Sequence, residues 1–277
     1  TQSRSSAASD VYKRQKECRG IRAEMDRLTK FDFRYDNPTP SWDSKRVKGV
    51  AANLFRIKDP KYSRALSSVI GGSWRNVVTD NDETGKLLLE RGNLQTRTTI
   101  IPMTKMNSRT IDQRVVNYAQ KLVGKENAIP AIDLIEYEKE VEPAMKFLFG
   151  HSFICKDLET AKKVTYDQNV RTRSYTLDGD LMDPEGSLSG GAVQQGPPIL
   201  DEAARYNQLK RQFDQKSQEI GDVNRKLAGI QQVAEQYKSV KDKLENFQMQ
   251  LKAAQDRLQS TTFQQNQDEI NELKTKV

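Results

Sequence analysis

The segment TLDGDLMDPEGSLSGGA, residues 176–192, is the stretch of sequence that decides the fold. Asp178-Gly179 lies between two short apolar runs, and this dipeptide is typical of the tight turn of a β-hairpin. Downstream the chain becomes glycine-rich, in the run Gly186-Ser187-Leu188-Ser189-Gly190-Gly191. Because glycine has no Cβ, clustered glycines usually serve turns or places where another backbone comes near. We therefore predict an edge strand that pairs with another chain by strand addition; a flexible linker is the alternative.

C-terminal to this segment, the sequence changes to a heptad pattern. Between Leu209 and Leu258, apolar residues alternate at spacings of four and three. Polar residues interrupt the alternation at Lys216, Lys241, Gln248 and Gln255. A seam of this period predicts a coiled coil, and so long and polar a helix cannot be buried on every side. We expect a C-terminal coiled-coil arm over residues 199–277, with a phase shift near Phe263; a bundle helix inside a globule is the alternative.

N-terminal to the core, a shorter apolar seam indicates a second helix. Cys18, Ile21, Met25 and Leu28 are spaced three and four apart, which predicts a coiled-coil stub within residues 16–35. Residues 1–15 show no such periodicity and no apolar core of a secretory signal. We expect them to be a disordered or non-native leader outside the fold.

The region between the two helical arms, residues 42–195, predicts a mixed α/β (α+β) domain. Helices are expected at residues 59–70, 83–91, 141–149 and 158–166. Strands are expected at residues 74–79, 98–101, 152–155 and 173–177, with a hairpin partner near Leu181-Met182. The fold class is therefore a two-lobed α+β domain flanked by antiparallel coiled-coil helices.

Two parts of this core resemble each other. The helix that ends at Gly71 recurs at Gly150 with a constant offset, under which Trp74 corresponds to Phe153. Shortly afterwards, Glu83-Thr84-Gly85-Lys86 resembles Glu159-Thr160-Ala161-Lys162. We interpret the pattern as two related lobes, at about residues 42–118 and 119–195; chance similarity of two helix–strand units is the alternative.

Charge is unevenly distributed between these lobes. The chain carries a formal net charge of +7 and a mean hydropathy of −0.80. Residues 42–118 hold 14 Lys or Arg against 7 Asp or Glu, whereas residues 119–198 hold 9 against 13. Such asymmetry favours either nucleic-acid contact by the first lobe or charge complementarity with a partner lobe. An ordinary solvated surface is the third interpretation.

The sequence offers no catalytic constellation. Leu188-Ser189-Gly190-Gly191 matches the start of an ABC ATPase signature, but no GxxxxGK[ST] phosphate-binding loop accompanies it. The single histidine and two cysteines without a CxxC pair leave no zinc site. Asp178, Asp180 and Asp183 fit a turn better than a metal cluster, since aspartate there bonds its own backbone. We predict no catalytic residue, cofactor or metal, and a reducing compartment, nucleus or cytoplasm.

With these motifs in view, residues 48–193 resemble the hinge domain of the structural maintenance of chromosomes (SMC) family. The resemblance rests on three motifs: Gly71-Gly72-Ser73-Trp74-Arg75-Asn76-Val77-Val78, Thr99-Ile100-Ile101-Pro102-Met103, and the segment from Thr176 to Ala192. The runs Glu90-Arg91-Gly92 and Glu136-Tyr137 to Phe149-Gly150 are most similar to the condensin branch. Coiled-coil stubs on both sides also suit the family.

The resemblance implies a dimerisation hinge of a chromosome-organising ATPase whose ATPase heads lie elsewhere. In the family, the first lobe of one protomer joins the second lobe of its partner through edge strands. The implied interface residues are Gly186, Ser187, Leu188, Ser189, Gly190, Gly191, Thr99, Ile100 and Ile101. Glu185 departs from the glycine that many prokaryotic hinges have there. The implied partner is a second SMC hinge, as a heterodimer in condensin or as a homodimer.

The family also implies DNA contact, with a preference for single strands, through basic surface near the coil junction. The candidate residues are Lys45, Arg46, Lys48, Arg171 and Arg173. A generic coiled-coil adaptor or homodimerisation module without DNA binding is the alternative function.

Overall fold

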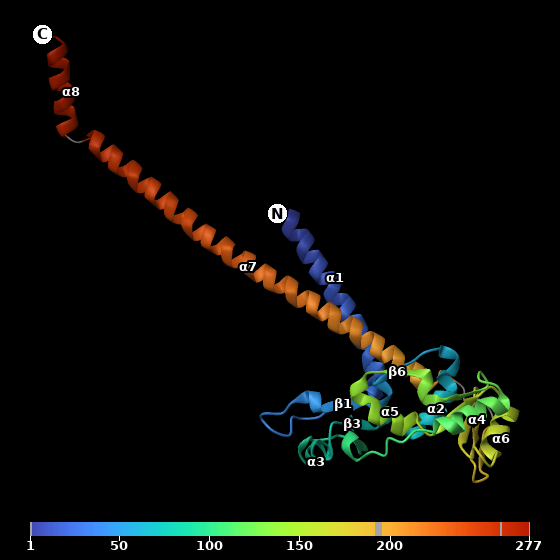
Figure 1. Ribbon diagram of the computed structural model, residues 1–277. Helices are drawn as coiled ribbons and strands as arrows, with labels where there is room; N and C mark the ends of the chain where they lie inside the picture. The colour runs from blue at the N-terminus through green and yellow to red at the C-terminus, as the bar shows by residue number, and fades with distance from the viewer. Residues whose placement is uncertain (1, 192–195, 261, 277) are drawn as a thin grey trace. The chain divides into compact units, whose positions relative to one another are not determined.

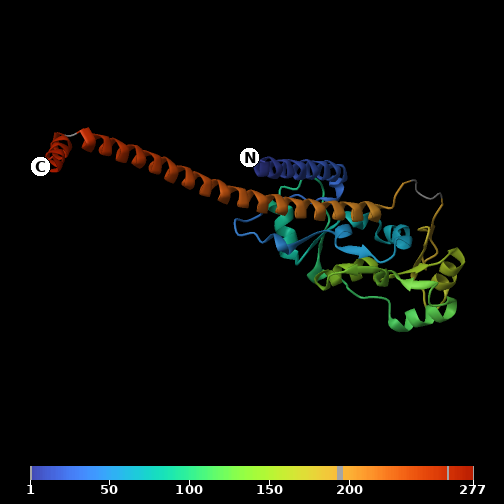
Figure 2. The same cartoon turned by 90° about the horizontal axis from the view of Figure 1, so that it is seen from above.

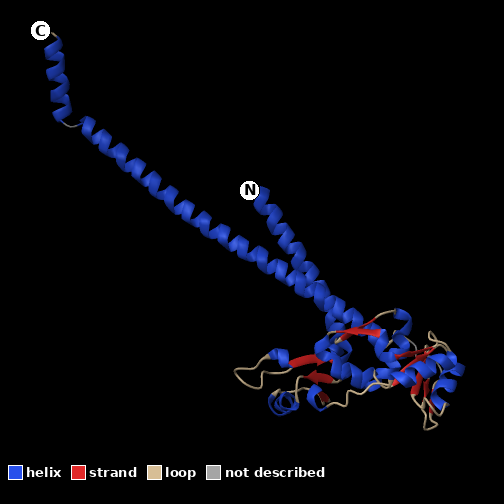
Figure 3. Cartoon of the chain, in the orientation of Figure 1, coloured by secondary structure: helices blue, strands red, loops and turns tan. Residues whose placement is uncertain are grey.

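The computed structural model describes residues 2–191, 196–260 and 262–276. The chain divides into two compact units, one formed by Thr1–Lys16 with Gln215–Val277 and the other by Glu17–Asp214. The larger unit holds every strand that the structure describes (Figure 3).

The larger unit contains three small sheets. The first has the order β1-β3-β4, with strands Val47–Val50, Val77–Thr79 and Ile100–Pro102. The second has the order β10-β9-β8-β7-β5, with strands Leu188–Ser189, Leu181–Met182, Arg173–Thr176, Ser152–Cys155 and Ala128–Pro130. The third pairs β2 (Phe55–Ile57) with β6 (Ile135–Tyr137). Both larger sheets therefore end in a short strand whose outer edge is open in the described part of the chain.

The two larger sheets repeat one topology. In the first, β1 is antiparallel to β3 and β3 is parallel to β4. In the second, β5 is antiparallel to β7 and β7 is parallel to β8. The helices of the repeat are α2 (Ser63–Ile70) and α3 (Asp82–Arg91), then α5 (Glu142–Phe149) and α6 (Leu158–Tyr166), with α4 (Gln113–Val123) between the lobes. The internal resemblance in the sequence thus corresponds to a repeated supersecondary unit.

Helix capping fixes how the two repeats correspond. The Asn81 side chain accepts a hydrogen bond from the Thr84 amide at 2.9 Å, and the Asp157 side chain accepts one from the Thr160 amide at 2.8 Å. Side-chain acceptors at this position satisfy the amides of a helix's first turn. Val77 precedes the cap residue Asn81 by four positions, and Phe153 precedes the cap residue Asp157 by the same number, so Phe153 corresponds to Val77. The predicted correspondence of Phe153 with Trp74 was wrong, because residues 71–75 form a 3-10 turn, η5 (Gly71–Arg75), that shortens the predicted strand.

The β2–β6 ribbon joins the lobes over a shared core. Arg56 of β2 lies opposite Glu136 of β6 at the centre of the antiparallel pair. Beneath it, one continuous cluster of buried side chains takes members from both lobes, including Leu66, Val78 and Phe149. A smaller cluster lies between α4, α6 and the second sheet. The lobes therefore fold on one main core.

The remaining short elements are 3-10 turns. They are η1 (Asp26–Phe31), η2 (Ser44–Arg46), η3 (Ala51–Asn53), η4 (Pro60–Tyr62), η6 (Met103–Lys105), η7 (Ala131–Leu134) and η8 (Lys139–Val141). All the predicted core helices are present. The sequence interpretation missed α4 and the strands β1, β2, β5 and β6.

The flanking helices are α1 (Gln2–Met25), α7 (Ile199–Ser260) and α8 (Thr262–Thr275). Residues 2–15, predicted to belong to a disordered or non-native leader, form part of α1 in the structure. Within the larger unit Arg205 of α7 pairs with Glu24 of α1 at 3.1 Å, and within the smaller unit Arg14 of α1 pairs with Glu219 of α7 at 2.8 Å; both helices are drawn in Figures 1 and 2. None of the described helices is long and apolar enough to cross a membrane.

Candidate dimerisation edges and DNA-contacting cations

Strand β10 ends the five-stranded sheet and carries the glycine-rich segment. Leu188 lies opposite Met182 and Ser189 opposite Leu181, and the Asp183 amide donates to the Ser187 carbonyl at 3.0 Å. Hydrogen-bonded and non-hydrogen-bonded pairs alternate along an antiparallel ladder. Because the Ser187–Asp183 pair is hydrogen-bonded, the Leu188 amide and carbonyl are directed away from β9. The edge therefore presents the amide and carbonyl of Leu188, which have no backbone partner among the described residues, and Leu188 as a residue is 58% exposed.

The turn between β9 and β10 is held by Asp183. Its carboxylate accepts from the Arg173 Nε at 2.6 Å and from the Glu185 amide at 2.9 Å. The Glu185 amide first and the Arg173 guanidinium second lower the pKa of Asp183 below its ordinary value. Deprotonated Asp183 therefore organises the turn that presents β10.

The three glycines of this segment serve its own conformation. Gly186 and Gly191 have φ values of +97° and +138°, a region that L-amino acids rarely adopt. At Gly190, a Cβ would lie 2.4 Å from the Asp180 Oδ1. These glycines are therefore needed for the backbone conformation of the segment itself, in addition to their predicted role of letting a partner strand approach.

Strand β4 ends the other sheet and carries the second predicted interface segment. The Val77 amide donates to the Thr99 carbonyl at 2.9 Å, so alternation along a parallel ladder directs the Ile100 amide and carbonyl outward. The next outward residue, Pro102, has no amide hydrogen, which is typical of an edge strand. The Ile101 side chain is 5% exposed and belongs to the core, so only the backbone near Ile100 and the exposed Thr99 can reach a partner.

The structure gives three of the five predicted DNA-contacting cations intramolecular partners. Arg46 pairs with Asp80 at 3.1 Å and lies 5.8 Å over the Trp42 ring. Lys48 pairs with Glu140 and is only 13% exposed, and Arg173 pairs with Asp183. Lys45 and Arg171 are exposed and make no ion pair among the described residues.

Contacts between the lobes explain part of the charge asymmetry. Lys48 pairs with Glu140, Arg56 with Glu136 at 3.3 Å, and the Lys58 Nζ donates to the Asp133 carbonyl at 2.7 Å. In each contact a first-lobe cation meets the second lobe of the same chain. The charges of the two lobes are therefore complementary within one chain.

The remaining chemistry-bearing residues have structural surroundings. Asp180 accepts from the Thr176 hydroxyl at 3.2 Å, as expected of a turn. Cys155 is buried, and burial raises the pKa of its thiol to about 12. Among the described residues, no group of three or more His, Cys, Asp or Glu side chains is arranged to hold a metal ion. What this surface offers is two open strand edges, at β4 and β10.

Comparison with known proteins agrees with this geometry. The family model for the SMC proteins flexible hinge domain matches residues 44–165. Structural maintenance of chromosomes protein 2 from Homo sapiens is 43% identical over 188 residues, which cover 68% of this chain and 16% of that protein. The proteins of the same name from Gallus gallus and Saccharomyces cerevisiae are 32% and 37% identical, covering 98% and 79% of this chain and 22% and 19% of their own lengths. The chain thus corresponds to a small part of each relative.

Solved structures show the same fold. An asymmetric dimer of the Geobacillus stearothermophilus SMC hinge domain matches with a TM-score of 0.51 at 18% identity, over 81% of this chain and 94% of that one. A structure described as the folded elbow of cohesin matches with a TM-score of 0.59 at 20% identity, over 92% of this chain and 39% of that one.

The chain therefore belongs to the SMC family, and its α+β core is an SMC hinge domain with coiled-coil extensions. Within the family, the three relatives named above share the designation structural maintenance of chromosomes protein 2, and the chain is similar to them through hinge and coil alike.

Proposed function

We propose that this chain is the dimerisation hinge of a condensin-type SMC protein and that it pairs with a second SMC hinge. The observation that carries the proposal is the pair of open edges, one at the end of each lobe's sheet. The β4 edge of one protomer would join the β10 edge of its partner, so two such junctions close the dimer. The solved asymmetric dimer of a Geobacillus stearothermophilus SMC hinge domain supports the pairing of two hinges.

Mass measurement tests the pairing. The chain is measured alone by light scattering, then mixed with the hinge of a candidate SMC partner at equal concentration. We expect a one-to-one complex in the mixture that survives gel filtration. If both hinges keep their separate masses and the chain alone is monomeric, the proposal fails.

We further propose that the hinge contacts DNA, with Lys45 and Arg171 as the principal candidates. Both are exposed, and neither forms an ion pair with another described residue. Reversal of both to Glu should weaken binding of a single-stranded oligonucleotide and flatten its salt dependence, because each phosphate contact releases counterions. The double variant Arg46→Gln with Arg173→Gln is the comparison, since those cations face Asp80 and Asp183. An unchanged affinity and salt slope for the Glu variant would reject these candidates.

The domain bounds follow the same proposal: a hinge over residues 42–195, a stub over 16–35, and an arm over 199–277. The lobe boundary predicted near residue 118 falls inside α4, which packs against α6 and the second sheet, so α4 belongs to the second lobe. The similarity to structural maintenance of chromosomes protein 2 from several organisms supports a place on chromosomes in the nucleus. The hinge itself would have no catalytic role, and ATP hydrolysis would belong to heads elsewhere in the longer protein.

A further inference from the structure

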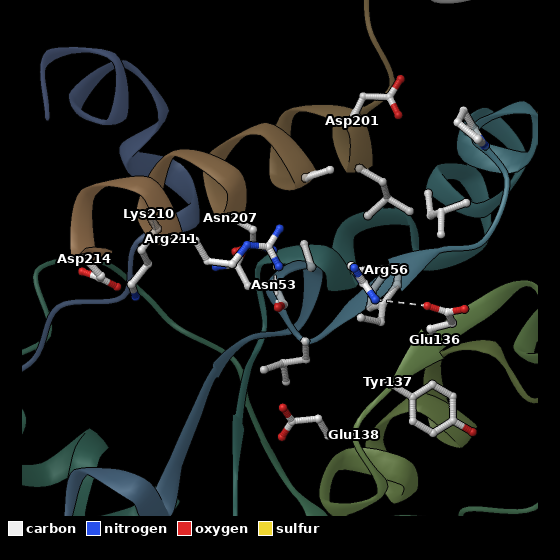
Figure 4. A pocket seen from close by; sticks show the side chains of 17 residues that line it. Asn53, Arg56, Glu136, Tyr137, Glu138, Asp201, Asn207, Lys210, Arg211 and Asp214 are labelled. Carbon is white, nitrogen blue, oxygen red and sulfur yellow. Dashed lines mark hydrogen bonds and ion pairs between the residues drawn. The ribbon is translucent and has the colours of Figure 1, made fainter. Parts of the chain in front are cut away.

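A cavity of about 980 Å³ lies within the larger unit, between the β2–β6 ribbon and the first turns of α7 (Figure 4). Arg56 on its lining already pairs with Glu136. The other charged side chains of the lining are of both signs: Glu138, Asp201, Lys210, Arg211 and Asp214. The cavity therefore selects no ligand by charge.

A loop of the same unit carries a more specific motif. Residues 32–43 form no helix or strand, and residues 35–42 within them form a closed loop, here named the strap loop. The Trp42 Nε1 donates to the Tyr35 hydroxyl at 3.3 Å, and the two rings meet edge to face with centroids 6.3 Å apart. The strap loop is therefore fixed at its two ends, and it lies at the periphery of the unit beside β1 (Figure 1).

The tip of the strap loop carries a hydroxyl residue followed by proline. Among the nine prolines of the chain, only Pro40 follows a serine or threonine, which is Thr39. Thr-Pro is a dipeptide that proline-directed protein kinases modify. Because proline has no amide hydrogen, it leaves no donor unpaired in the apolar pocket that receives this position. Thr39-Pro40 is therefore the one dipeptide of this chain that fits this class of enzyme.

Little structure has to open before an enzyme reaches Thr39. Its hydroxyl makes no hydrogen bond to another described residue, and its carbonyl accepts from the Trp42 amide at 3.1 Å. Pro40 and Ser41 are exposed, Thr39 is half-buried and Pro38 is buried. The residues that follow the hydroxyl and carry the motif are thus open to an enzyme, and breaking one turn bond frees the hydroxyl.

A second kinase-type motif shows how the structure discriminates between hydroxyl groups. Arg64-Ala65-Leu66-Ser67 has the Arg-x-x-Ser pattern of basophilic kinases. Ser67 lies inside α2, however, and its hydroxyl accepts a hydrogen bond from the Leu200 amide at 3.4 Å. A kinase cleft takes its substrate in extended form, so a helix of the core would first have to unfold. The structure therefore favours Thr39 over Ser67.

Cations beside the strap loop give a phosphate there a consequence. The Arg46 guanidinium lies 5.8 Å over the Trp42 ring, and Trp42 closes the turn that begins at Thr39. Lys45, a candidate for DNA contact, is exposed and has no ion-pair partner in the described part of the chain. The neighbouring carboxylate of Asp43 is used to cap η2, where it accepts from the Lys45 amide at 3.0 Å. A phosphate on the loop adds a charge of about −2 and three acceptor oxygens near these cations.

We propose that a proline-directed protein kinase phosphorylates Thr39 and that the phosphate withdraws Lys45 from DNA. In the transfer, the Thr39 Oγ attacks the γ-phosphorus of a nucleoside triphosphate, the bond from that phosphorus to the bridging oxygen breaks, and the nucleoside diphosphate leaves. The hydroxyl proton passes to the base of the kinase. The effect on DNA rests on the DNA contact proposed above; the modification itself does not, and it uses neither β4 nor β10.

Incubation of the whole chain with a purified mitogen-activated protein kinase and radiolabelled ATP tests the site. We expect label that mass spectrometry maps to Thr39. Thr39→Val, which keeps the shape of the side chain, should remove the label, and Ser41→Ala, at the neighbouring exposed hydroxyl, should keep it. Pro40→Ala should slow labelling by at least about tenfold, because it restores an amide hydrogen. Label that persists in Thr39→Val would overturn the assignment.

Synthetic peptides are the comparison for access. The folded chain should be labelled at a rate within about tenfold of a peptide of residues 33–46, because only one turn bond has to open. A basophilic kinase should label a peptide of residues 60–72 at Ser67 but leave Ser67 of the folded chain unmodified. A folded chain that stays unlabelled at Thr39 while its peptide is labelled would overturn the proposal.

Oligonucleotide binding tests the effect on DNA. The phosphorylated chain should bind a single-stranded oligonucleotide more weakly than the unmodified chain, with a salt slope lower by about one, since one phosphate contact is lost. Lys45→Gln should remove most of this difference. Equal affinity of the two forms would overturn the coupling. If the unmodified chain binds no oligonucleotide, the proposed DNA contact fails, and the kinase assay still decides the site at Thr39.

Discussion

At the scale of single residues, Phe31 shows what the sequence pattern conceals. Its ring is 1% exposed and lies 5.2 Å from the Trp74 ring and 6.1 Å from the Tyr206 ring. It joins the end of the N-terminal helical segment to the hinge core and to α7. The sequence analysis placed Phe31 only within the predicted stub over residues 16–35, because the residues that bury it are remote along the chain.

Replacement of Phe31 by Ala should lower the free energy of unfolding by about 3–5 kcal/mol, the usual cost of removing a buried aromatic ring. Urea denaturation followed by circular dichroism measures the change. Phe33→Ala, at a half-buried neighbour, is the control and should cost clearly less. Equal losses for both variants would show that Phe31 is not an anchor.

Burial also predicts how stability responds to alkali. Burial raises the pKa of the Cys155 thiol from 9.0 to about 12, and burial followed by Asp32 raises the pKa of Tyr206 from 10.0 to about 12. The unfolded chain releases these protons at lower pH than the folded chain does, so stability should fall as pH rises from about 9 through 12. Denaturation midpoints across this range measure it, and Cys155→Ala should make the fall shallower. A slope that Cys155→Ala leaves unchanged would contradict this origin.

At the scale of secondary structure, the sequence revealed α2, α3, α5 and α6 but missed the 11-residue α4 and the strands β1, β2, β5 and β6. Helices such as α5 and α6 carry enough residues to display an apolar face, and the buried run Ser152–Cys155 was recognised as a strand. Strands β2 and β6 have three residues each, too few to show a period of two. The glycine-rich edge could be predicted from the sequence, because a positive φ selects glycine at the position itself and needs no remote contact.

Strand β10 gives a sharp test of the proposed edge. Leu188→Pro removes an amide that points outward and leaves the bonds to β9 intact, so it should abolish dimerisation while the monomer stays folded. Light scattering gives the mass and circular dichroism the fold; Leu188→Thr, which keeps the amide, should still dimerise. An intact dimer of the proline variant would remove β10 from the interface. Substitutions at Gly190 and Gly191 are poorer tests, because they disturb the monomer itself.

The arm carries a second apolar register beside the predicted one. From Ile230 onward, an unbroken spacing of three and four joins Ile230, Val233, Tyr237, Val240, Leu244, Phe247, Leu251, Ala254 and Leu258, all exposed. The register predicted from the sequence instead passes through Lys241 and Gln248. The change from one register to the other corresponds to an insertion of three residues into the apolar repeat, which is a known discontinuity of coiled coils.

We expect this second register to be the one that packs against another helix. At high concentration the chain should self-associate through it, and Val240→Glu with Phe247→Glu should reduce the association by sedimentation equilibrium. Lys241→Glu with Gln248→Glu, on the predicted register, is the matched pair. A larger effect from that pair would restore the original register.

At the scale of the whole molecule, composition and charge pointed to the architecture but not to the site. The low apolar content belongs to the exposed arm, and the fold class was predicted from the helix–strand order and the resemblance of the lobes. The DNA-contacting cations were harder to predict, because Arg46 and Lys48 lie close to Lys45 in sequence yet pair with Asp80 and Glu140. A local sequence pattern cannot reveal ion-pair partners that come from remote segments of the chain.

The central claim, that the β4 edge meets the β10 edge of a partner hinge, is tested most directly by site-specific crosslinking. A photoreactive benzoylphenylalanine replaces the exposed Thr99, and the complex with its partner hinge is irradiated and mapped by mass spectrometry. The same group at exposed Tyr118 on α4 is the control and should yield no such product. We predict crosslinks between Thr99 and the partner segment equivalent to Gly186–Gly191. Crosslinks confined to the same chain, or to the partner's coil, would contradict the account.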